Sequence, residues 1–353
     1  MGKSISFAPA LGAALMVGSI GETTTAAAFS PAPLFNDAAS YTTTISANNN
    51  TADIYFPNPS NLKTGNYSFP IALLLEGANV DKSNYSNFAS IVARYGFVVV
   101  VANQPAPPQF GFAGLLPTTS QINAVLAQMV VENSKATSPI AGVVNTQKLA
   151  LLGHSAGGAV GLSAIANLCL PFVCETSFSR PKELVAGVFF GANLRKFPTE
   201  EFIPINNSGI PIALLQGNID SIALPARAKA TYDQIKDPPK ALITVLGANH
   251  YGITNTNNPL GARPDTNAPT IAQDVAVETV ARWSGLFLRA SVLNDKDAFD
   301  YVYSTGDTID ANVSAIGQAK PVPELSLTLG LVALSTWGTV SRLKKRKQKT
   351  VAS

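Results

Sequence analysis

The fold of this chain is decided by the stretch KLALLGHSAGG at residues 148–158. Its four apolar residues, 149–152, predict a short buried strand, and the small residues from Ala159 onward predict a helix. Between them lies the pattern Gly-x-Ser-x-Gly, whose two glycines allow a tight turn. The pattern predicts a nucleophile elbow with the hydroxyl of Ser155 exposed on a strained corner. The alternative is a glycine turn without chemistry.

Apolar runs on both sides of this stretch predict an alternation of strands and helices. We expect a hairpin from 41–47 and 52–56, strands at 69–75, 97–102, 185–190, 210–215 and 241–246, and helices over 88–95, 122–130 and 269–287. Strands that alternate with helices indicate an α/β protein with a mostly parallel sheet, covered by helices on both faces. Such sheets bind ligands beyond the carboxyl ends of their strands.

A serine nucleophile needs a base, and the chain has only two histidines. His154 lies inside the elbow and is expected to point away from the nucleophile, which leaves His250 as the candidate base. Asp220 follows the predicted strand at 210–215 and is the candidate acid. The order Ser155, Asp220, His250 is the one expected along such a fold. The alternatives are a turn-capping aspartate and a loop histidine bonded to backbone.

Two backbone N–H groups are needed to bind the oxyanion of an acyl-transfer reaction. The first is expected from Ala156, directly after the nucleophile. The second is expected from the loop after the strand at 69–75, at Ala78 or Asn79. Glu76 in this loop is predicted to be a buried carboxylate tied to a neighbouring loop.

The loop at 105–116 follows a predicted sheet strand and carries several large apolar residues. Phe110, Phe112 and Leu115 are candidate substrate-binding residues that form an apolar wall. Packing in a small satellite core is the equally favoured alternative.

The two cysteines, Cys169 and Cys174, are close in sequence. In an exported chain they predict a short-loop disulfide, and in a cytosolic chain two buried thiols. Two histidines and two cysteines exclude a multi-histidine metal site and make a zinc site a poor interpretation.

The net charge of +3 comes from the C-terminal end, where six Lys and Arg residues follow position 341, so the rest of the chain carries −3. This distribution argues against nucleic-acid binding.

Both ends of the chain have the composition of targeting segments. Residues 1–28 predict a secretory signal peptide, with Lys3 before an apolar run and alanines before the expected cleavage site. The first six residues also fit a myristoylation pattern, which the apolar run behind them makes a coincidence. At the other end, Pro-Val-Pro-Glu at 321–324 precedes an apolar stretch, 325–340, and a basic cluster. As a helix this stretch would span about 24 Å, marginal for a hydrocarbon core of about 30 Å.

The C-terminal layout resembles the PEP-CTERM sorting signal of exported bacterial proteins, with Leu325 in place of the usual last proline. The resemblance implies recognition by an exosortase-type enzyme and transient membrane contact through residues 321–353. The alternative is a plain C-terminal anchor. In either case we expect an exported protein, periplasmic or at the cell surface, that is first held in the inner membrane.

The span from about Tyr41 to Phe287 resembles the α/β-hydrolase family, nearest to its chlorophyllase and dienelactone-hydrolase-like branch, which borders on cutinase-like polyester hydrolases. The resemblance is carried by residues 71–79, 94–100, 153–158, 217–220 and 249–250. It departs from the family at Ala156, where chlorophyllases tend to have arginine, and at Glu76, where many relatives have histidine.

The resemblance implies hydrolysis of a small carboxylic ester through an acyl-enzyme, without metal or organic cofactor. The domain prediction is a signal peptide at 1–28, a catalytic domain at 29–293, a polar tether at 294–320 and a sorting tail at 321–353. The alternatives are a hydrolase specific for polyesters or pigment esters, and a non-catalytic binding module that kept the fold.

Overall fold

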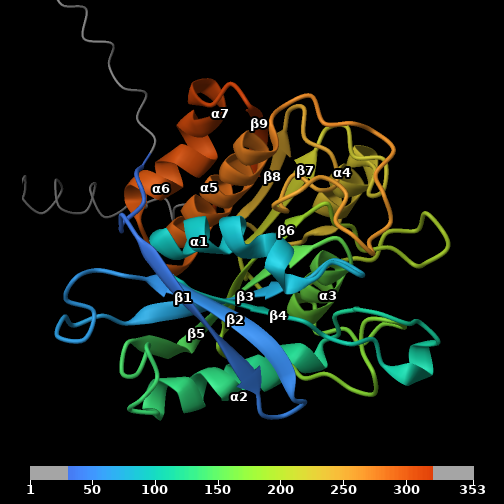
Figure 1. Cartoon of the computed structure of the whole chain (residues 1–353). Helices are drawn as coiled ribbons and strands as arrows, with labels where there is room; N and C mark the ends of the chain where they lie inside the picture. Colours follow the sequence, from blue (N-terminus) through green and yellow to red (C-terminus); the bar gives the residue numbers. More distant parts are fainter. Residues whose placement is uncertain (1–30, 321–353) are drawn as a thin grey trace, which may run out of the picture.

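One sheet of nine strands forms the centre of the computed structural model, which describes residues 31–320. The strands are β1 (Ala38–Ile45), β2 (Asn50–Pro57), β3 (Phe69–Leu75), β4 (Val98–Ala102), β5 (Val144–His154), β6 (Leu184–Phe190), β7 (Ile212–Gly217), β8 (Lys240–Val245) and β9 (Val313–Gln318). Their order across the sheet is β1-β2-β4-β3-β5-β6-β7-β8-β9 (Figure 1). All the predicted strands and the hairpin are therefore present, with ends shifted by a few residues.

The strands from β4 to β8 in this order are parallel, whereas both edges of the sheet are antiparallel. On one edge β2 runs antiparallel to β1 and β4, and on the other β9 runs antiparallel to β8. The prediction of an α/β-hydrolase fold with a mostly parallel sheet and helices on both faces is confirmed.

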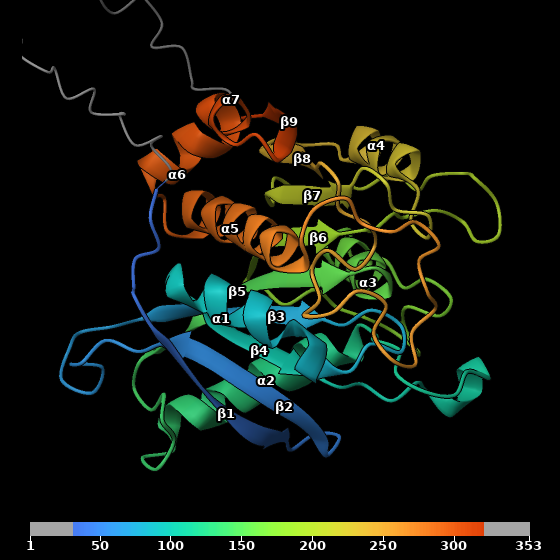
Figure 2. The ribbon, with the colours of Figure 1, turned by 45° about the horizontal axis from the view of Figure 1, so that its top comes forward.

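Helices cover the two faces of this sheet in separate layers (Figure 2). One face carries α1 (Ser86–Arg94), α5 (Gln273–Val292) and α6 (Lys296–Asp300), and the other α2 (Ser120–Ser134), α3 (Ala156–Ile165) and α4 (Pro225–Gln234). The strand β3 shows why the sheet is buried on both sides. Its residues Ala72 and Leu74 belong to the core beneath α1 and α5, whereas Ile71, Leu73 and Leu75 belong to the core beneath α2 and α3. A continuous apolar run is the pattern that two covered faces require.

The prediction of a polar tether at 294–320 is wrong, because this segment belongs to the domain. It forms α6, a π-helical turn at Tyr301–Thr305, α7 (Gly306–Ile309) and the edge strand β9. Asp310 accepts hydrogen bonds from the indole of Trp283 (2.7 Å) and from Arg282 (2.9 Å), both on α5. An edge strand has one unpaired side, and in β9 only Val313 is buried, so its composition looks like that of a linker.

Among residues 31–320, no helix combines the length and the apolar character needed to cross a bilayer. The predicted signal peptide and the sorting tail lie outside the described residues.

The parallel strands bring four segments to the same end of the sheet, beyond the carboxyl ends of the strands. Glu76 follows β3, Ser155 follows β5, Asp220 comes three residues after β7, and His250 five residues after β8. Because these strands are parallel, their carboxyl ends lie side by side, and segments far apart in the chain become neighbours.

Candidate active site

Ser155 lies on the corner between β5 and α3 with a backbone conformation that is rare for a residue with a side chain. Its φ is 53° and its ψ is −115°, and its N–H donates to the carbonyl of Phe190 at 2.9 Å. Such a conformation costs on the order of 1–3 kcal/mol, which the surrounding fold must supply. The side chain is partly exposed, whereas His154 before it is fully buried.

The second glycine of the motif allows α3 to approach the end of β3. A Cβ built on Gly157 would lie 2.1 Å from the carbonyl oxygen of Leu75 and 2.6 Å from that of Glu76. A Cβ on Gly153 would meet Gly157 and Gly158 backbone atoms at 2.8 Å. Both glycines are therefore required by close packing of the elbow, which is the geometry that the motif predicts.

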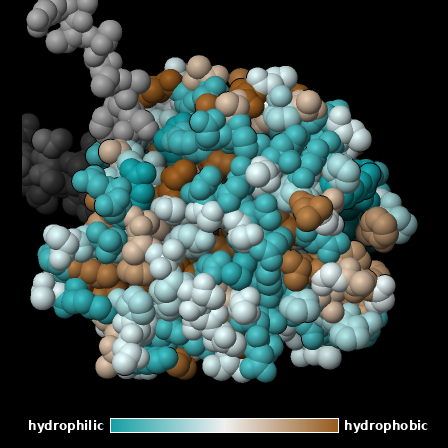
Figure 3. Space-filling model, viewed as in Figure 1, coloured by the Kyte–Doolittle hydropathy of each residue, from teal (hydrophilic) through white to brown (hydrophobic). Residues whose placement is uncertain are grey.

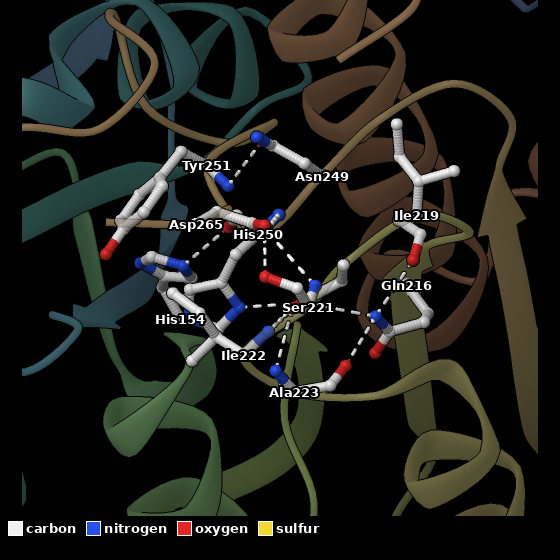
Figure 4. A network of polar contacts seen from close by, with 12 residues as sticks. His154, Gln216, Ile219, Ser221, Ile222, Ala223, Asn249, His250, Tyr251 and Asp265 are labelled. Atoms are coloured by element: carbon white, nitrogen blue, oxygen red, sulfur yellow. Dashed lines mark hydrogen bonds and ion pairs between the residues drawn. The ribbon is translucent and has the colours of Figure 1, made fainter. Parts of the chain in front are cut away.

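Asp220 and His250 are joined by a short hydrogen bond in a buried environment. His250 Nδ1 lies 2.7 Å from Asp220 Oδ2, and both side chains are almost completely buried. The same carboxylate accepts hydrogen bonds from the backbone N–H groups of Ile222 (2.8 Å) and Ala223 (2.7 Å) and from the amide of Gln216 (3.1 Å) (Figure 4). The carboxylate thus keeps one orientation and fixes that of the imidazole. Since Nδ1–H of His250 donates to Asp220, the other ring nitrogen of the neutral imidazole, Nε2, keeps its lone pair.

A second buried carboxylate, Asp265, holds the backbone around this pair. Its Oδ2 accepts from the N–H of His250 at 2.9 Å, and its Oδ1 accepts from Ser221 Oγ (2.5 Å) and from the N–H of Asn267 (2.8 Å) (Figure 4). Burial alone would raise the pKa of Asp265, but these donors outweigh it and lower the pKa below its ordinary value. Asp265 therefore ties the residue after Asp220 to the candidate base. Nothing in the sequence distinguishes it from the other polar residues of its loop.

The elbow lies directly beside the Asp220–His250 pair. Gly191, next to the residue that accepts from Ser155 N–H, comes so close that a Cβ on it would lie 3.1 Å from His250 Nδ1 and 3.2 Å from Asp220 Oδ2. The rings of His154 and His250 have centroids 4.8 Å apart. Within the described residues, no hydrogen bond joins the Ser155 hydroxyl to His250, and such bonds are often long until substrate binds.

The structure corrects part of the prediction of the oxyanion donors. Ala156 is the first residue of α3, so its N–H has no partner within the helix. The N–H of Asn79 donates to the carbonyl of Leu115 at 2.9 Å, so the prediction of Asn79 as a donor is wrong. The N–H of Gly77 is bonded to Tyr85. Ala78 between them has an N–H with no partner among residues 31–320, and it remains the candidate.

Glu76 is a buried carboxylate tied to a neighbouring loop, as the sequence predicts. It is fully buried, and it accepts from the N–H of Gln104 (2.6 Å) and from the side-chain amide of Gln121 (3.2 Å). Burial raises the pKa of Glu76 to about 7, although these donors and its own N–H counteract the rise. The side-chain oxygen of Gln121 is buried without a partner among the described residues.

Replacing Glu76 by glutamine is expected to stabilise the protein at pH 8 and to have little effect at pH 4.5. The folded-state pKa lies above the ordinary value of a glutamate, so the folded protein binds the proton more tightly and loses stability as the pH rises toward about 7. The glutamine does not titrate, so its advantage should grow over this range to roughly 2–3 kcal/mol. Urea unfolding of both proteins at a series of pH values measures the difference.

The control for this measurement is Glu132→Gln, since Glu132 is a buried carboxylate with the opposite shift. Burial would raise the pKa of Glu132, but donors including Ser138, Thr43 and Tyr41 lower it. This variant should lose stability at neutral pH, with the loss shrinking as the pH falls through the folded-state pKa. Parallel stability curves for Glu76→Gln and the wild type would contradict the assignment of Glu76.

The loop at 105–116 is attached to the segment that carries Ala78. Leu115 donates its N–H to Asn79 Oδ1 at 2.9 Å and accepts from Asn79 N–H, so the loop lies beside the candidate oxyanion donor. Phe110 packs edge-on against Phe172, with ring centroids 5.6 Å apart. Phe112 is 37% exposed and Phe172 56% exposed. The aromatic pair Phe110–Phe172 is a feature that the sequence does not predict.

Cys169 and Cys174 form a disulfide that closes the loop carrying Phe172. The N–H of Thr119 donates to the carbonyl of Val173 in this loop, which holds it against the start of α2. On the face seen in Figure 3, hydrophobic side chains occur in small groups among hydrophilic ones. Within residues 31–320, no group of three or more His, Cys, Asp or Glu side chains is arranged to hold a metal ion.

Comparison with known families agrees with the fold. Residues 33–172 match the family model described as Chlorophyllase. The match is less than half of the chain and runs from just before β1 to the disulfide loop. It includes Ser155, Ala78 and Glu76 but neither Asp220 nor His250. It indicates a hydrolase that acts on esters. No curated protein matches the sequence.

Proposed function

We propose that this chain is a serine hydrolase that cleaves carboxylic esters through Ser155, His250 and Asp220. The observation that carries the proposal is the buried 2.7 Å pair of Asp220 and His250 next to a serine on a strained elbow. Buried carboxylate–imidazole pairs beside a nucleophile are the usual means of activating a serine hydroxyl.

The arrangement supports a two-step reaction. His250 Nε2 accepts the proton of Ser155 as Oγ bonds to the ester carbonyl carbon, and the N–H groups of Ala156 and Ala78 bind the resulting oxyanion. The tetrahedral species collapses, the bond to the alcohol breaks, and His250 returns the proton to the leaving alcohol. A water molecule, deprotonated by His250, then attacks the acyl carbon, the bond to Ser155 Oγ breaks as His250 returns the proton to Oγ, and the acid is released. Asp220 holds the imidazole and stabilises its charged form throughout.

Phe110, Phe112 and Leu115 are proposed as an apolar wall for the acyl or alcohol part of a small ester. They are supported by the attachment of their loop to Asn79. A second candidate, hydrolysis of a pigment ester, is favoured over a polyester by the match to the Chlorophyllase model.

Export is proposed from the ends of the chain and from the cysteines. A disulfide between Cys169 and Cys174 suits an oxidising compartment. The resemblance of residues 321–353 to a sorting signal supports processing by an exosortase-type enzyme after transient anchoring in the inner membrane.

The test of the hydrolase proposal is labelling with a fluorophosphonate, which reacts with activated serines. Mass spectrometry of the wild-type protein should show one adduct per chain, located on the peptide that contains Ser155. The variant Ser155→Ala and the heat-unfolded wild type should not be labelled. A well-folded wild type that takes up no label would refute the proposal. A series of nitrophenyl esters of increasing chain length would then define the acyl preference.

A further inference from the structure

A chain of buried hydrogen bonds connects the candidate oxyanion segment to the candidate base. The N–H of Gly77 donates to Tyr85 Oη at 2.8 Å, Tyr85 Oη lies 2.9 Å from His154 Nδ1, and His154 Nε2 lies 2.9 Å from the carbonyl oxygen of His250. Tyr85 and His154 are both fully buried. The four residues come from the loop after β3, the turn before α1, the end of β5 and the loop after β8.

The groups at the two ends of this series of hydrogen bonds fix the direction of every bond in it. The carbonyl of His250 can only accept, so His154 must carry its proton on Nε2. Nδ1 then has a lone pair and accepts from the hydroxyl of Tyr85. The hydroxyl oxygen accepts in turn from the N–H of Gly77. One tautomer of His154 therefore satisfies all the groups, and the other would place a lone pair of Nε2 against the carbonyl oxygen.

We propose that Tyr85 and His154 are positioning residues, which lock His154 as its Nε2–H tautomer and so hold the backbone of His250 at a fixed place relative to the oxyanion segment. This inference rests on the proposed function. The carbonyl of His250 is held by His154, and its N–H is held by Asp265 at 2.9 Å. The base is thus restrained on both sides of its Cα, and Asp220 restrains its ring.

The same series of hydrogen bonds determines which N–H group is free for the oxyanion. Gly77 donates to Tyr85 and Asn79 donates to Leu115, so Ala78 is left between two tethered residues. A shift of His250 and a shift of Ala78 are therefore coupled through two side chains. Misplacing either group by a fraction of an ångström affects the transition state more than the binding of substrate.

The surroundings keep His154 neutral, which the hydrogen-bond chain requires. Burial lowers the pKa of His154 well below 6.5, and electrostatic repulsion from nearby His250 in its protonated form lowers it further. The rings within about 6 Å are those of Tyr85, Phe190, His250 and Tyr251, and none of them carries a negative charge at neutral pH. Burial raises the pKa of Tyr85 well above 10, so its hydroxyl keeps its proton.

The experiment uses the fact that the chain has only two histidines. In full-length protein labelled with ¹⁵N-histidine, the ring nitrogens of His154 are assigned with the variant His250→Ala. From pH 5 to 9, we expect His154 to keep a protonated Nε2 and an unprotonated Nδ1. In Tyr85→Phe the proton should stay on Nε2, but Nδ1 loses its donor, so the Nδ1 resonance should move downfield, and kcat for a nitrophenyl ester should fall about tenfold with KM unchanged.

The matched control is Tyr251→Phe. The ring of Tyr251 lies as close to His154 as that of Tyr85, with a centroid distance of 5.9 Å in both cases, but its hydroxyl donates to the carbonyl of Arg263. This variant should leave the Nδ1 resonance of His154 unchanged. A charged or Nδ1–H form of His154 in the wild type, or a Tyr85→Phe variant with unchanged Nδ1 resonance and kcat, would overturn the inference. The ¹⁵N spectra do not depend on turnover, so an inactive wild type would refute only the proposed hydrolysis.

Discussion

Replacing His250 by alanine is expected to lower kcat for a nitrophenyl ester by about 10⁴- to 10⁶-fold. His250 is the only histidine with a ring nitrogen left free to accept the proton of Ser155, because both nitrogens of His154 are hydrogen-bonded. Without a base, Ser155 remains a neutral alcohol, which is a poor nucleophile. Initial rates at saturating ester, compared with the wild type in the same buffer, measure the loss.

Two observations separate a lost base from a lost fold in this variant. The circular dichroism spectrum should match that of the wild type. Because His250 is buried, its removal leaves a cavity shaped for an imidazole. Added imidazole should therefore restore part of the activity, and should not do so for Ser155→Ala. Turnover within tenfold of the wild type would mean that another group acts as the base.

Replacing Gly157 by alanine is expected to reduce kcat at least 10²-fold and to lower Tm by about 5–10 °C. The added Cβ would lie 2.1 Å from the carbonyl oxygen of Leu75, an atom of the backbone that no side-chain rotation can move away. α3 must then separate from β3, which displaces the N–H of Ala156 from the segment that carries Ala78. Steady-state kinetics and thermal unfolding on the same sample measure both effects.

The matched control is Gly142→Ala. Gly142 has a φ of 76° and no atom within 4 Å of an added Cβ, and it lies between α2 and β5, away from the site. This variant should lose about 1 kcal/mol of stability through backbone strain while keeping wild-type kcat. If Gly157→Ala lost no more activity than Gly142→Ala, the close approach of α3 to β3 would not matter for the reaction.

Much of the sheet could be predicted from the sequence because its strands are buried on both faces. The runs at 69–75 and 97–102 contain hardly any polar residue, and no other element suits such short apolar segments between turns. The end of the domain could not be predicted in this way. Strand β9 pairs on one side only and buries little beyond Val313, so its pairing with β8 depends on a partner some seventy residues earlier in the chain.

The candidate site was predictable where the chemistry demands rare residue types. The chain offers only two histidines as a base, and the elbow has the distinctive spacing Gly-x-Ser-x-Gly. The supporting residues carry no such mark. Asp265 lies among other polar loop residues, and Tyr85 is one of nine tyrosines, so only the folded loops reveal what each one holds. Contacts in the folded loops likewise decide which of Ala78 and Asn79 has an N–H group available to bind an oxyanion.

The direction of the two edge strands determines how the molecule presents itself to its surroundings. Because β9 runs against β8, it starts beside Val245 and finishes beside Lys240, at the amino end of the parallel strands. β1 starts at that same end, since its first residue pairs with Pro57, at the far end of β2 from the residue paired with Ala102. A tether that continues from β1 or β9 would therefore attach at the amino end of the parallel strands. Ser155 follows the carboxyl end of β5, so the candidate site would face away from the attachment point.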